Sequence, residues 1–226
     1  MNNPNITQSK IVNVKFGRNV NIVEPCNLYG CTLGDDVLIG PFVEIQSEVS
    51  IGDKCKIQSH SFICSMVNIG NNCFIGHGVM FINDSFSNGG PANRDKSLWK
   101  FTNIGDNVSI GSNCKIGHNT IIEKNVTIGN NCSIGSNTII RNTIINDNVR
   151  ILDRCVIGKH GFGFFPANNQ NLRYPHIGIV KIEDNCEIGC GATIDRGSMS
   201  NTVIGKNTYL DNQICLLYTS PSPRDS

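Results

Sequence analysis

The sequence is poor in large side chains: aromatic residues make up 7% of its 226 residues, with a single tryptophan. We therefore expect a thin, repetitive fold rich in turns. Lys and Arg number 19 and Asp and Glu 18, a balance that gives no reason to expect nucleic acid or an anionic membrane as partner. The chain lacks both the apolar segment of a signal peptide and a run long enough for a transmembrane segment. We therefore expect a cytoplasmic protein.

The eleven cysteines lack the C-x-x-C spacing that is typical of metal and redox motifs. Most of them fall at one phase of a six-residue repeat: Cys26, Cys55, Cys73, Cys114, Cys132, Cys155 and Cys186. A reduced thiol is a small side chain that is easily buried. The cysteines are therefore predicted to fill the core, and we expect neither a metal nor a bound cofactor.

Large aliphatic residues recur at every sixth position over most of the chain. An unbroken run comprises Leu33, Ile39, Ile45, Ile51, Ile57, Ile63, Ile69, Ile75 and Phe81, and the same frame resumes at Ile104 and continues with interruptions to Leu210. A period of six fits neither an α-helix nor a flat sheet with two-residue alternation. It indicates a short strand followed by a turn, three of which make one triangular coil. The interior aliphatics then stack from coil to coil at about 4.8 Å, and about nine coils are expected.

The frame predicts a single β-helix domain over residues 11–214, after an N-terminal extension at 1–10. Two segments interrupt it, at 82–103 and 161–179. The first contains the only tryptophan and the second contains three phenylalanines. Because loops on a rigid scaffold commonly carry binding residues, we expect both insertions to serve a function. The alternative is that they are tolerated insertions without a role.

Residues 11–113 resemble UDP-2-acetamido-3-amino-sugar N-acetyltransferases of surface-polysaccharide synthesis. The strings that carry this resemblance are NVNIVEPCNLYGCTLGDDVLIGPFVEIQ, KIQSHSFIC and NCFIGHGVMFINDSFSNGGPA. The resemblance implies transfer of an acetyl group from acetyl-CoA to a sugar amine. It also implies the left-handed sense of the β-helix, which departs from the usual right-handed crossover of parallel strands.

Residues 114–214 resemble another hexapeptide-repeat family, the UDP-3-O-acylglucosamine N-acyltransferases of lipid A synthesis. The matching strings are VIGKHGFGFFP, RYPHIGIVKIEDNCEIGCGATIDRGSMSNTVIG and LDNQI. This resemblance implies an acyl carrier protein as the acyl donor. Both families imply a UDP-linked amino sugar as acceptor and a homotrimer with active sites between subunits.

The sequence also departs from the second family. That family has a separate uridine-binding domain, which this chain has no room for, and a histidine just beyond the DNQ string, where this chain has none. Residues 215–226 read instead like a translated sequencing adapter, and we expect a non-native tail there. The two halves are interpreted as an assembly chimera joined near NVSIGSN or as a natural hybrid. We expect residues 217–226 to lie off the helix and the lipid A-type activity to be missing.

Acyl transfer to an amine needs a base for the amine and groups that orient the sugar. The predicted catalytic residues are His77, which the resemblance to sugar acetyltransferases supports, and Asn83 and Asp84 at the start of the first insertion. The predicted substrate-binding residues are Glu44, Gln46, Gln58, His60, Asp195, Arg196, Asp211, Asn212 and Gln213. For each, an exposed polar face or a structural salt bridge is the alternative. His118 has the corner phase of His77 without an attached loop and is interpreted as a surface residue, whereas His160 and His176 flank the second insertion.

The sequence therefore predicts an all-β protein, a left-handed parallel β-helix of hexapeptide repeats with two loop insertions. The predicted function is N-acyl transfer to a UDP-linked amino sugar, with either donor. An inactive β-helix scaffold is the alternative of another class. A zinc enzyme on this fold would need three convergent histidines, and the five present show no pair at ligand spacing.

Overall fold

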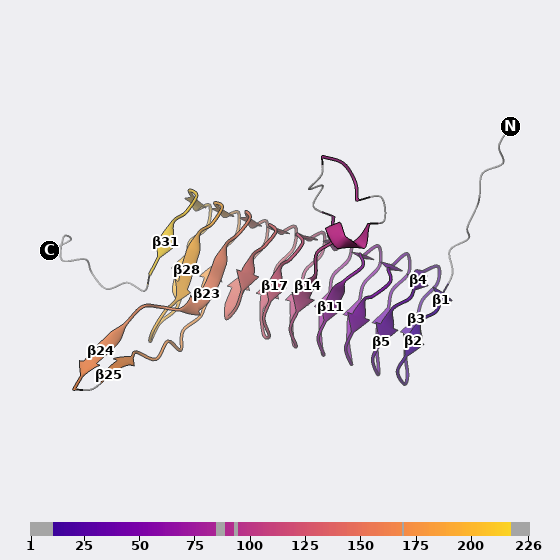
Figure 1. Cartoon of the computed structure of the whole chain (residues 1–226), viewed down its shortest axis with the longest axis horizontal. Helices are drawn as coiled ribbons and strands as arrows, with labels where there is room; N and C mark the ends of the chain where they lie inside the picture. The colour runs from indigo at the N-terminus through magenta and orange to yellow at the C-terminus, as the bar shows by residue number, and fades with distance from the viewer. Residues whose placement is uncertain (1–10, 85–88, 93–94, 169, 218–226) are drawn as a thin grey trace.

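A computed structural model describes residues 11–84, 89–92, 95–168 and 170–217. The chain winds into a long prism whose three walls are parallel sheets (Figure 1). Where no insertion intervenes, partners on successive coils are 17 or 18 residues apart, as for Thr127 and Ile144 or Ile51 and Ile69, so three repeats of about six residues complete each coil. The predicted fold class, an all-β left-handed parallel β-helix of hexapeptide repeats, is confirmed.

Most strands contain two or three residues, and every third strand in the chain belongs to the same wall. Within the described residues, sheet A comprises β1 (Ile11–Val12), β4 (Asn27–Tyr29), β7 (Glu44–Ile45), β10 (Phe62–Ile63), β13 (Met80–Phe81), β16 (Lys115–Ile116), β19 (Ser133–Ile134), β22 (Arg150–Ile151), β27 (Glu187–Ile188) and β30 (Tyr209–Leu210). Sheet B comprises β2 (Lys15–Phe16), β5 (Thr32–Leu33), β8 (Ser50–Ile51), β11 (Val67–Ile69), β14 (Thr102–Ile104), β17 (Ile121–Ile122), β20 (Ile139–Ile140), β23 (Val156–His160), β28 (Thr193–Arg196) and β31 (Cys215–Leu216). Sheet C comprises β3 (Asn21–Ile22), β6 (Leu38–Ile39), β9 (Lys56–Ile57), β12 (Phe74–Ile75), β15 (Ser109–Ile110), β18 (Thr127–Ile128), β21 (Thr143–Ile145), β26 (Val180–Ile182) and β29 (Thr202–Ile204).

The aliphatic frame forms the core of the prism. Ile69 pairs in register with Ile51 on one side and with Ile104 on the other, so one column of side chains runs through three coils. The aliphatics of this frame from Leu33 to Ile204 are buried. Two-residue strands expose one side chain and bury the next, and the stacked interior supplies most of the apolar burial that stabilises the fold.

The cysteines fill the predicted core positions. The seven at the common phase are all buried and free, and so are Cys31 and Cys64. Burial raises the pKa of the Cys31 thiol to about 11, which keeps it protonated and unreactive. They therefore act as small apolar side chains that pack beside the isoleucine columns.

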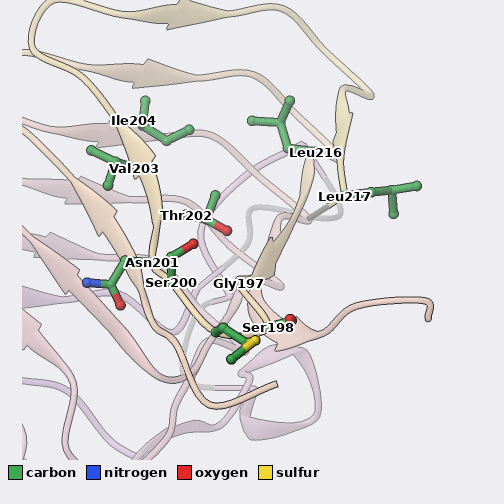
Figure 2. Close-up of a pocket in the computed structure, with 10 residues that line it drawn as sticks. Gly197, Ser198, Ser200, Asn201, Thr202, Val203, Ile204, Leu216 and Leu217 are labelled. Atoms are coloured by element: carbon green, nitrogen blue, oxygen red, sulfur yellow. The ribbon is translucent and has the colours of Figure 1, made fainter. Parts of the chain in front are cut away.

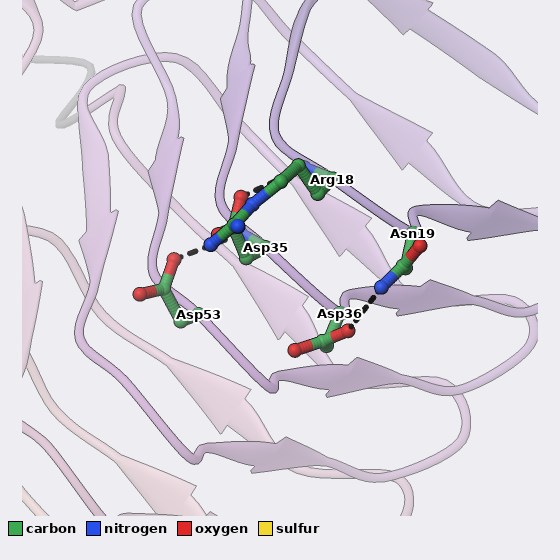
Figure 3. A network of polar contacts seen from close by, with 5 residues as sticks. All are labelled: Arg18, Asn19, Asp35, Asp36 and Asp53. Atoms are coloured by element: carbon green, nitrogen blue, oxygen red, sulfur yellow. Dashed lines mark hydrogen bonds and ion pairs between the residues drawn. The ribbon is translucent and has the colours of Figure 1, made fainter.

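Turn residues at the three edges stack in the same way as the core. Many adopt left-handed backbone conformations, and most of these are Asn, which tolerates positive φ. On the edge between sheets B and C, a carboxylate accepts a hydrogen bond from a backbone N–H of the preceding coil. Asp35 Oδ1 accepts from Arg18 N at 2.7 Å, and Asp53 Oδ1 accepts from Asp35 N at 2.8 Å (Figure 3). These ladders satisfy turn amides that face away from the strands.

Each insertion leaves the prism at a different edge (Figure 1). The first joins β13 in sheet A to β14 in sheet B and contains a short 3₁₀ helix, η1 (Lys96–Leu98). The second joins β23 in sheet B to β26 in sheet C and contains an antiparallel hairpin of β24 (Phe164–Ala167) and β25 (Gln170–Arg173). The second insertion, predicted as a loop, is therefore a β-hairpin.

The prism extends slightly further than the sequence predicts. β31 pairs with β28 through Thr193–Cys215 and Ile194–Leu216, so the predicted end at 214 is two residues short. Sheets A and B each have ten strands within the described ranges, one more than the nine coils expected. Leu217 is exposed, and the predictions for residues 1–10 and 218–226 lie outside the described residues. No helix in the described part of the chain is long and apolar enough to cross a membrane.

Candidate functional site

The first insertion folds back over the edge between sheets A and B, which we call the A–B edge. Lys100 N donates to Asn83 O at 3.0 Å, and Asp84 forms an isolated antiparallel bridge with Trp99. The Lys96 ammonium makes an ion pair with Glu48 on the adjoining turn of an earlier coil. These contacts place Trp99 and Lys96 against the prism wall rather than away from it.

A cavity of about 510 Å³ lies between this insertion and the prism. It is lined by Tyr29, Gln46, Ser47, Ser65, Lys96 and Trp99. The lining combines two aromatic rings with amide, hydroxyl and ammonium groups. Aromatic faces with a small number of placed polar groups are suited to a polar ring such as a sugar or a nucleobase.

Hydrogen bonds beside the cavity hold the predicted substrate residues in place. Gln46 Nε2 donates to Glu44 Oε1 at 3.1 Å, and Gln46 Oε1 accepts from Ser65 N at 3.2 Å. Asn83, which is buried, donates from Nδ2 to Ser65 O at 3.0 Å. Glu44, Gln46 and Asn83 therefore belong to one connected network of hydrogen bonds.

Asp84 and His118 lie on the same edge as this network. Asp84 Oδ2 accepts from Ala92 N at 2.8 Å and so fixes the path of the insertion. His118 follows β16 on the next coil, and its Nδ1 lies 2.8 Å from Ser136 Oγ. Burial lowers the pKa of His118 most, and Asp153, Lys100 and Asp84 act on that pKa through their charges. His118 is therefore near the insertion, in contrast to its interpretation as a plain surface residue.

His77 lies on the edge between sheets C and A, away from Asn83 and Asp84 within one chain. It follows β12 of sheet C, is exposed as its corner phase predicts, and its Nδ1 lies 2.8 Å from Ser59 Oγ. His60 is also on this edge and stacks on Phe42 with ring centroids 4.9 Å apart. Gln58 lies in the same turn and is half-buried. The predicted polar face is therefore divided between two edges of the protomer.

Asp195 and Arg196 anchor the second insertion to the prism. The Asp195 carboxylate is fully buried and pairs with Lys159 Nζ at 2.5 Å. Arg196 Nε donates to Gly178 O at 2.6 Å, at the point where the insertion returns. His160 and His176 lie at the two ends of the insertion, with ring centroids 6.0 Å apart. These contacts favour the structural alternative for Asp195 and Arg196.

The DNQ string forms a turn on the A–B edge, several coils beyond the cavity. Asn212 Oδ1 accepts from Cys190 N at 2.7 Å, and Gln213 N donates to Cys190 O at 2.8 Å. Asp211, Asn212 and Gln213 are exposed. The structure therefore does not bring them to the network that contains Asn83.

Another cavity, of about 380 Å³, lies beside β29 and β31 (Figure 2). Its walls are Gly197 to Ile204 with Leu216 and Leu217, and Figure 2 shows these side chains gathered around the turn after β28. The lining has no titratable side chain. It therefore offers no group for proton transfer, and the A–B edge is the better candidate.

The sequence assigned no role to Tyr29, Ser65 or Trp99, and it predicted His118 only as a surface residue. Ser65 and Ser47 are separated by 18 residues, and their hydroxyls lie 3.4 Å apart. Counting one coil, 18 residues, onward from Ser47 in the sequence leads to Ser65. Trp99 depends on the path of the insertion, for which the repeat gives no signal.

Comparisons with known proteins agree with the six-residue repeat. A model of the bacterial transferase hexapeptide (six repeats) matches residues 30–65, and one of the GMPPB C-terminal domain matches residues 100–161. Together with the stacked hexads, this makes the chain a hexapeptide-repeat β-helix protein.

Its curated relatives are nucleotide-sugar acyltransferases. UDP-3-O-acylglucosamine N-acyltransferase 1 of Nitrobacter winogradskyi is 46% identical over 76 residues, which are 33% of this chain and 21% of that protein. The enzyme of Bradyrhizobium diazoefficiens is 45% identical over 76 residues, again 33% and 21%. The chain thus spans about a fifth of the length of these relatives, 21% in each case. The resemblance to UDP-3-O-acylglucosamine N-acyltransferases is confirmed.

Among solved structures, a UDP-N-acetylglucosamine acyltransferase from Bacteroides fragilis 9343 is similar, with a TM-score of 0.48 and 17% sequence identity. The alignment covers 88% of this chain and 71% of that one.

Proposed function

We propose that the protein is an N-acyltransferase that acts on a UDP-linked amino sugar. The observation that carries the proposal is the local identity of 46% to a UDP-3-O-acylglucosamine N-acyltransferase. The cavity on the A–B edge adds a site of suitable chemistry, since its aromatic and amide groups fit a pyranose or uracil ring.

In this proposal, the acceptor sugar lies against the network of Glu44, Gln46 and Asn83. The Glu44 carboxylate and the amides can accept and donate hydrogen bonds to sugar hydroxyls. Trp99 packs on the ring, and Asp84 holds the insertion that carries Trp99. His77 lies on another edge of the protomer and remains a candidate for a substrate contact that a neighbouring subunit of a homotrimer would contribute.

Two acyl donors remain in the proposal, an acyl carrier protein and acetyl-CoA. The resemblance of residues 114–214 favours the first donor, and the resemblance of residues 11–113 favours the second. We also propose a cytoplasmic location. The free, buried cysteines support it, because disulfides are rare in that reducing compartment.

The test is turnover by the purified full chain with UDP-linked amino sugars, each paired with acetyl-CoA and with an acylated carrier protein. Thiol release measures the rate, and mass spectrometry detects the amide product. We expect a product with one donor and a loss of turnover in Asn83→Ala. Saturable binding of the sugar without turnover by either donor would instead favour the scaffold alternative and contradict the proposal.

A further inference from the structure

Two serine–histidine pairs of the same geometry occur on different edges of the prism. Ser136 Oγ lies 2.8 Å from His118 Nδ1, and Ser59 Oγ lies 2.8 Å from His77 Nδ1. In both pairs the residues are 18 apart, so each serine is one coil away from its histidine. A bond at Nδ1 leaves Nε2 of each ring available for another partner.

The surroundings of the two histidines differ. His118 is half-buried on the A–B edge, where the first insertion, with Asp84 and Lys100, folds over the prism. His77 is exposed on the edge between sheets C and A, where no insertion covers it. A base for acyl transfer must be next to the acceptor and partly shielded from water. His118 meets the second condition, and it flanks the proposed acceptor site, because it lies on the same edge as Asn83, one coil further along the prism.

We infer that His118 is the general base for the acceptor amine and that Ser136 is the positioning residue that orients its ring. The inference rests on the proposed function and deepens it. With Nδ1 protonated and donating to Ser136 Oγ, Nε2 presents its lone pair to the amine. Ser136 is itself fixed by the coil that follows it, because the backbone N of Ser136 donates to Asp153 Oδ1 at 2.7 Å.

The step balances with this chain's groups and the two substrates. The amine nitrogen attacks the thioester carbonyl and forms the C–N bond, and the proton leaving that nitrogen passes to His118 Nε2. The tetrahedral intermediate then breaks its C–S bond. The departing sulfur takes the proton from the imidazolium, which leaves an amide, a thiol and neutral His118.

Three charged groups act on His118 and decide its protonation. Asp84 and Lys100 act on it from the insertion, and Asp153 does so from the coil that follows the Ser136 turn. Burial, the largest cause, and Lys100 lower the pKa of His118, whereas the two carboxylates raise it. The net effect is downward, so the ring is neutral and able to accept a proton near pH 7.

The experiment compares kcat/KM across pH for wild type and for variants of both pairs. We expect His118→Ala to lose about 10²- to 10⁴-fold, the usual contribution of a general base. Ser136→Ala should lose about tenfold, the rate equivalent of one hydrogen bond, and move the acidic limb of the profile. Ser136→Thr, which keeps a hydroxyl, should restore both.

Ser59→Ala is the matched control, because it removes a bond of the same length from His77. We expect it to lower thermal stability as much as Ser136→Ala does while turnover is retained. A rate within twofold of wild type in His118→Ala, or the large loss in His77→Ala instead, would overturn the assignment. Absence of turnover in wild type would be a failure of the proposed function, before any variant is compared.

A second readout does not depend on activity. Nitrogen NMR of the ¹⁵N-histidine protein distinguishes the two neutral tautomers of His118. We expect the Nδ1–H tautomer in wild type and in Ser136→Thr, and a mixture in Ser136→Ala. The Nε2–H tautomer in wild type would remove the lone pair that the step requires and would contradict the inference.

Discussion

The Asp195 carboxylate lies 2.5 Å from the Lys159 ammonium, and the aspartate side chain is 0% exposed whereas that of the lysine is 36% exposed. The two residues are partners in the register of β23 and β28, so the pair joins successive coils where the second insertion begins. A buried carboxylate is costly to desolvate and depends on its partner. The ion pair between Lys159 and Asp195 therefore anchors the start of the second insertion, which contains the hairpin, to the prism.

Removal of the Lys159 ammonium should destabilise the protein strongly. Lys159→Met leaves the fully buried Asp195 carboxylate without its partner, and breaking such a pair costs about 3 kcal/mol at the low end of its range. Chemical denaturation measures the change. Glu187→Gln is the control, because the Glu187–Arg150 pair at 3.8 Å is exposed and should contribute about 0–1 kcal/mol. Equal changes in the two variants would contradict the burial argument.

A glycine is required at position 158, where the pairing of β23 with β28 shifts register. Gly158 has φ of +80°, and an added Cβ would lie 1.6 Å from Arg141 O. Gly158→Ala should therefore cost at least about 1–3 kcal/mol, the price of such a backbone conformation before the clash is counted. Thermal unfolding measures it. Gly205→Ala is the control, since nothing lies within 4 Å of its added Cβ, and it should unfold close to wild type.

The single tryptophan should report ligand binding directly. Trp99 lines the cavity on the A–B edge, so a UDP-linked amino sugar that enters it changes the environment of the indole ring. We expect a saturable change in intrinsic fluorescence, and a weaker affinity in Gln46→Leu because that amide faces the same cavity. A signal that does not saturate, or equal affinity in both proteins, would place the sugar elsewhere.

Removal of the Lys100 charge should shift the acidic limb of the activity profile. The Lys100 ammonium lowers the pKa of His118, although burial lowers it more. In Lys100→Met the pKa of His118 rises, the ring stays protonated to a higher pH, and the limb of kcat/KM moves upward. Lys124→Met, on the edge between sheets B and C, should leave the limb in place. A downward shift in Lys100→Met would contradict this sign.

The core was predictable because the repeat reports directly on burial. Ile69 and its partners are separated by whole coils, and a buried position in one hexad implies a buried position in the next. The turn residues with positive φ were predictable for a similar reason, since Asn recurs at the turn positions that need this backbone conformation. The hairpin within the second insertion was not, because its antiparallel strands interrupt the repeat that carries the signal.

The site was less predictable because a hexad phase does not identify an edge. His77 and His118 share a phase, yet His77 follows a strand of sheet C and His118 a strand of sheet A. The sequence predicted Asn83 with His77, whereas the chain places Asn83 and His118 on one edge. The two histidines can be assigned to different edges only by counting the strands in groups of three, on both sides of the first insertion.

That threefold count also governs which changes in length the chain can tolerate. Deletion of 18 residues would shorten the prism by one coil and return every later side chain to its own edge, since 18 residues separate equivalent positions. Deletion of a single hexad between the first insertion and His118 would keep the isoleucines inside, yet rotate all that follows by one wall and carry His118 away from the insertion. Such proteins can therefore gain or lose whole coils and keep the two groups together, whereas one hexad gained or lost at that place preserves the fold and separates them.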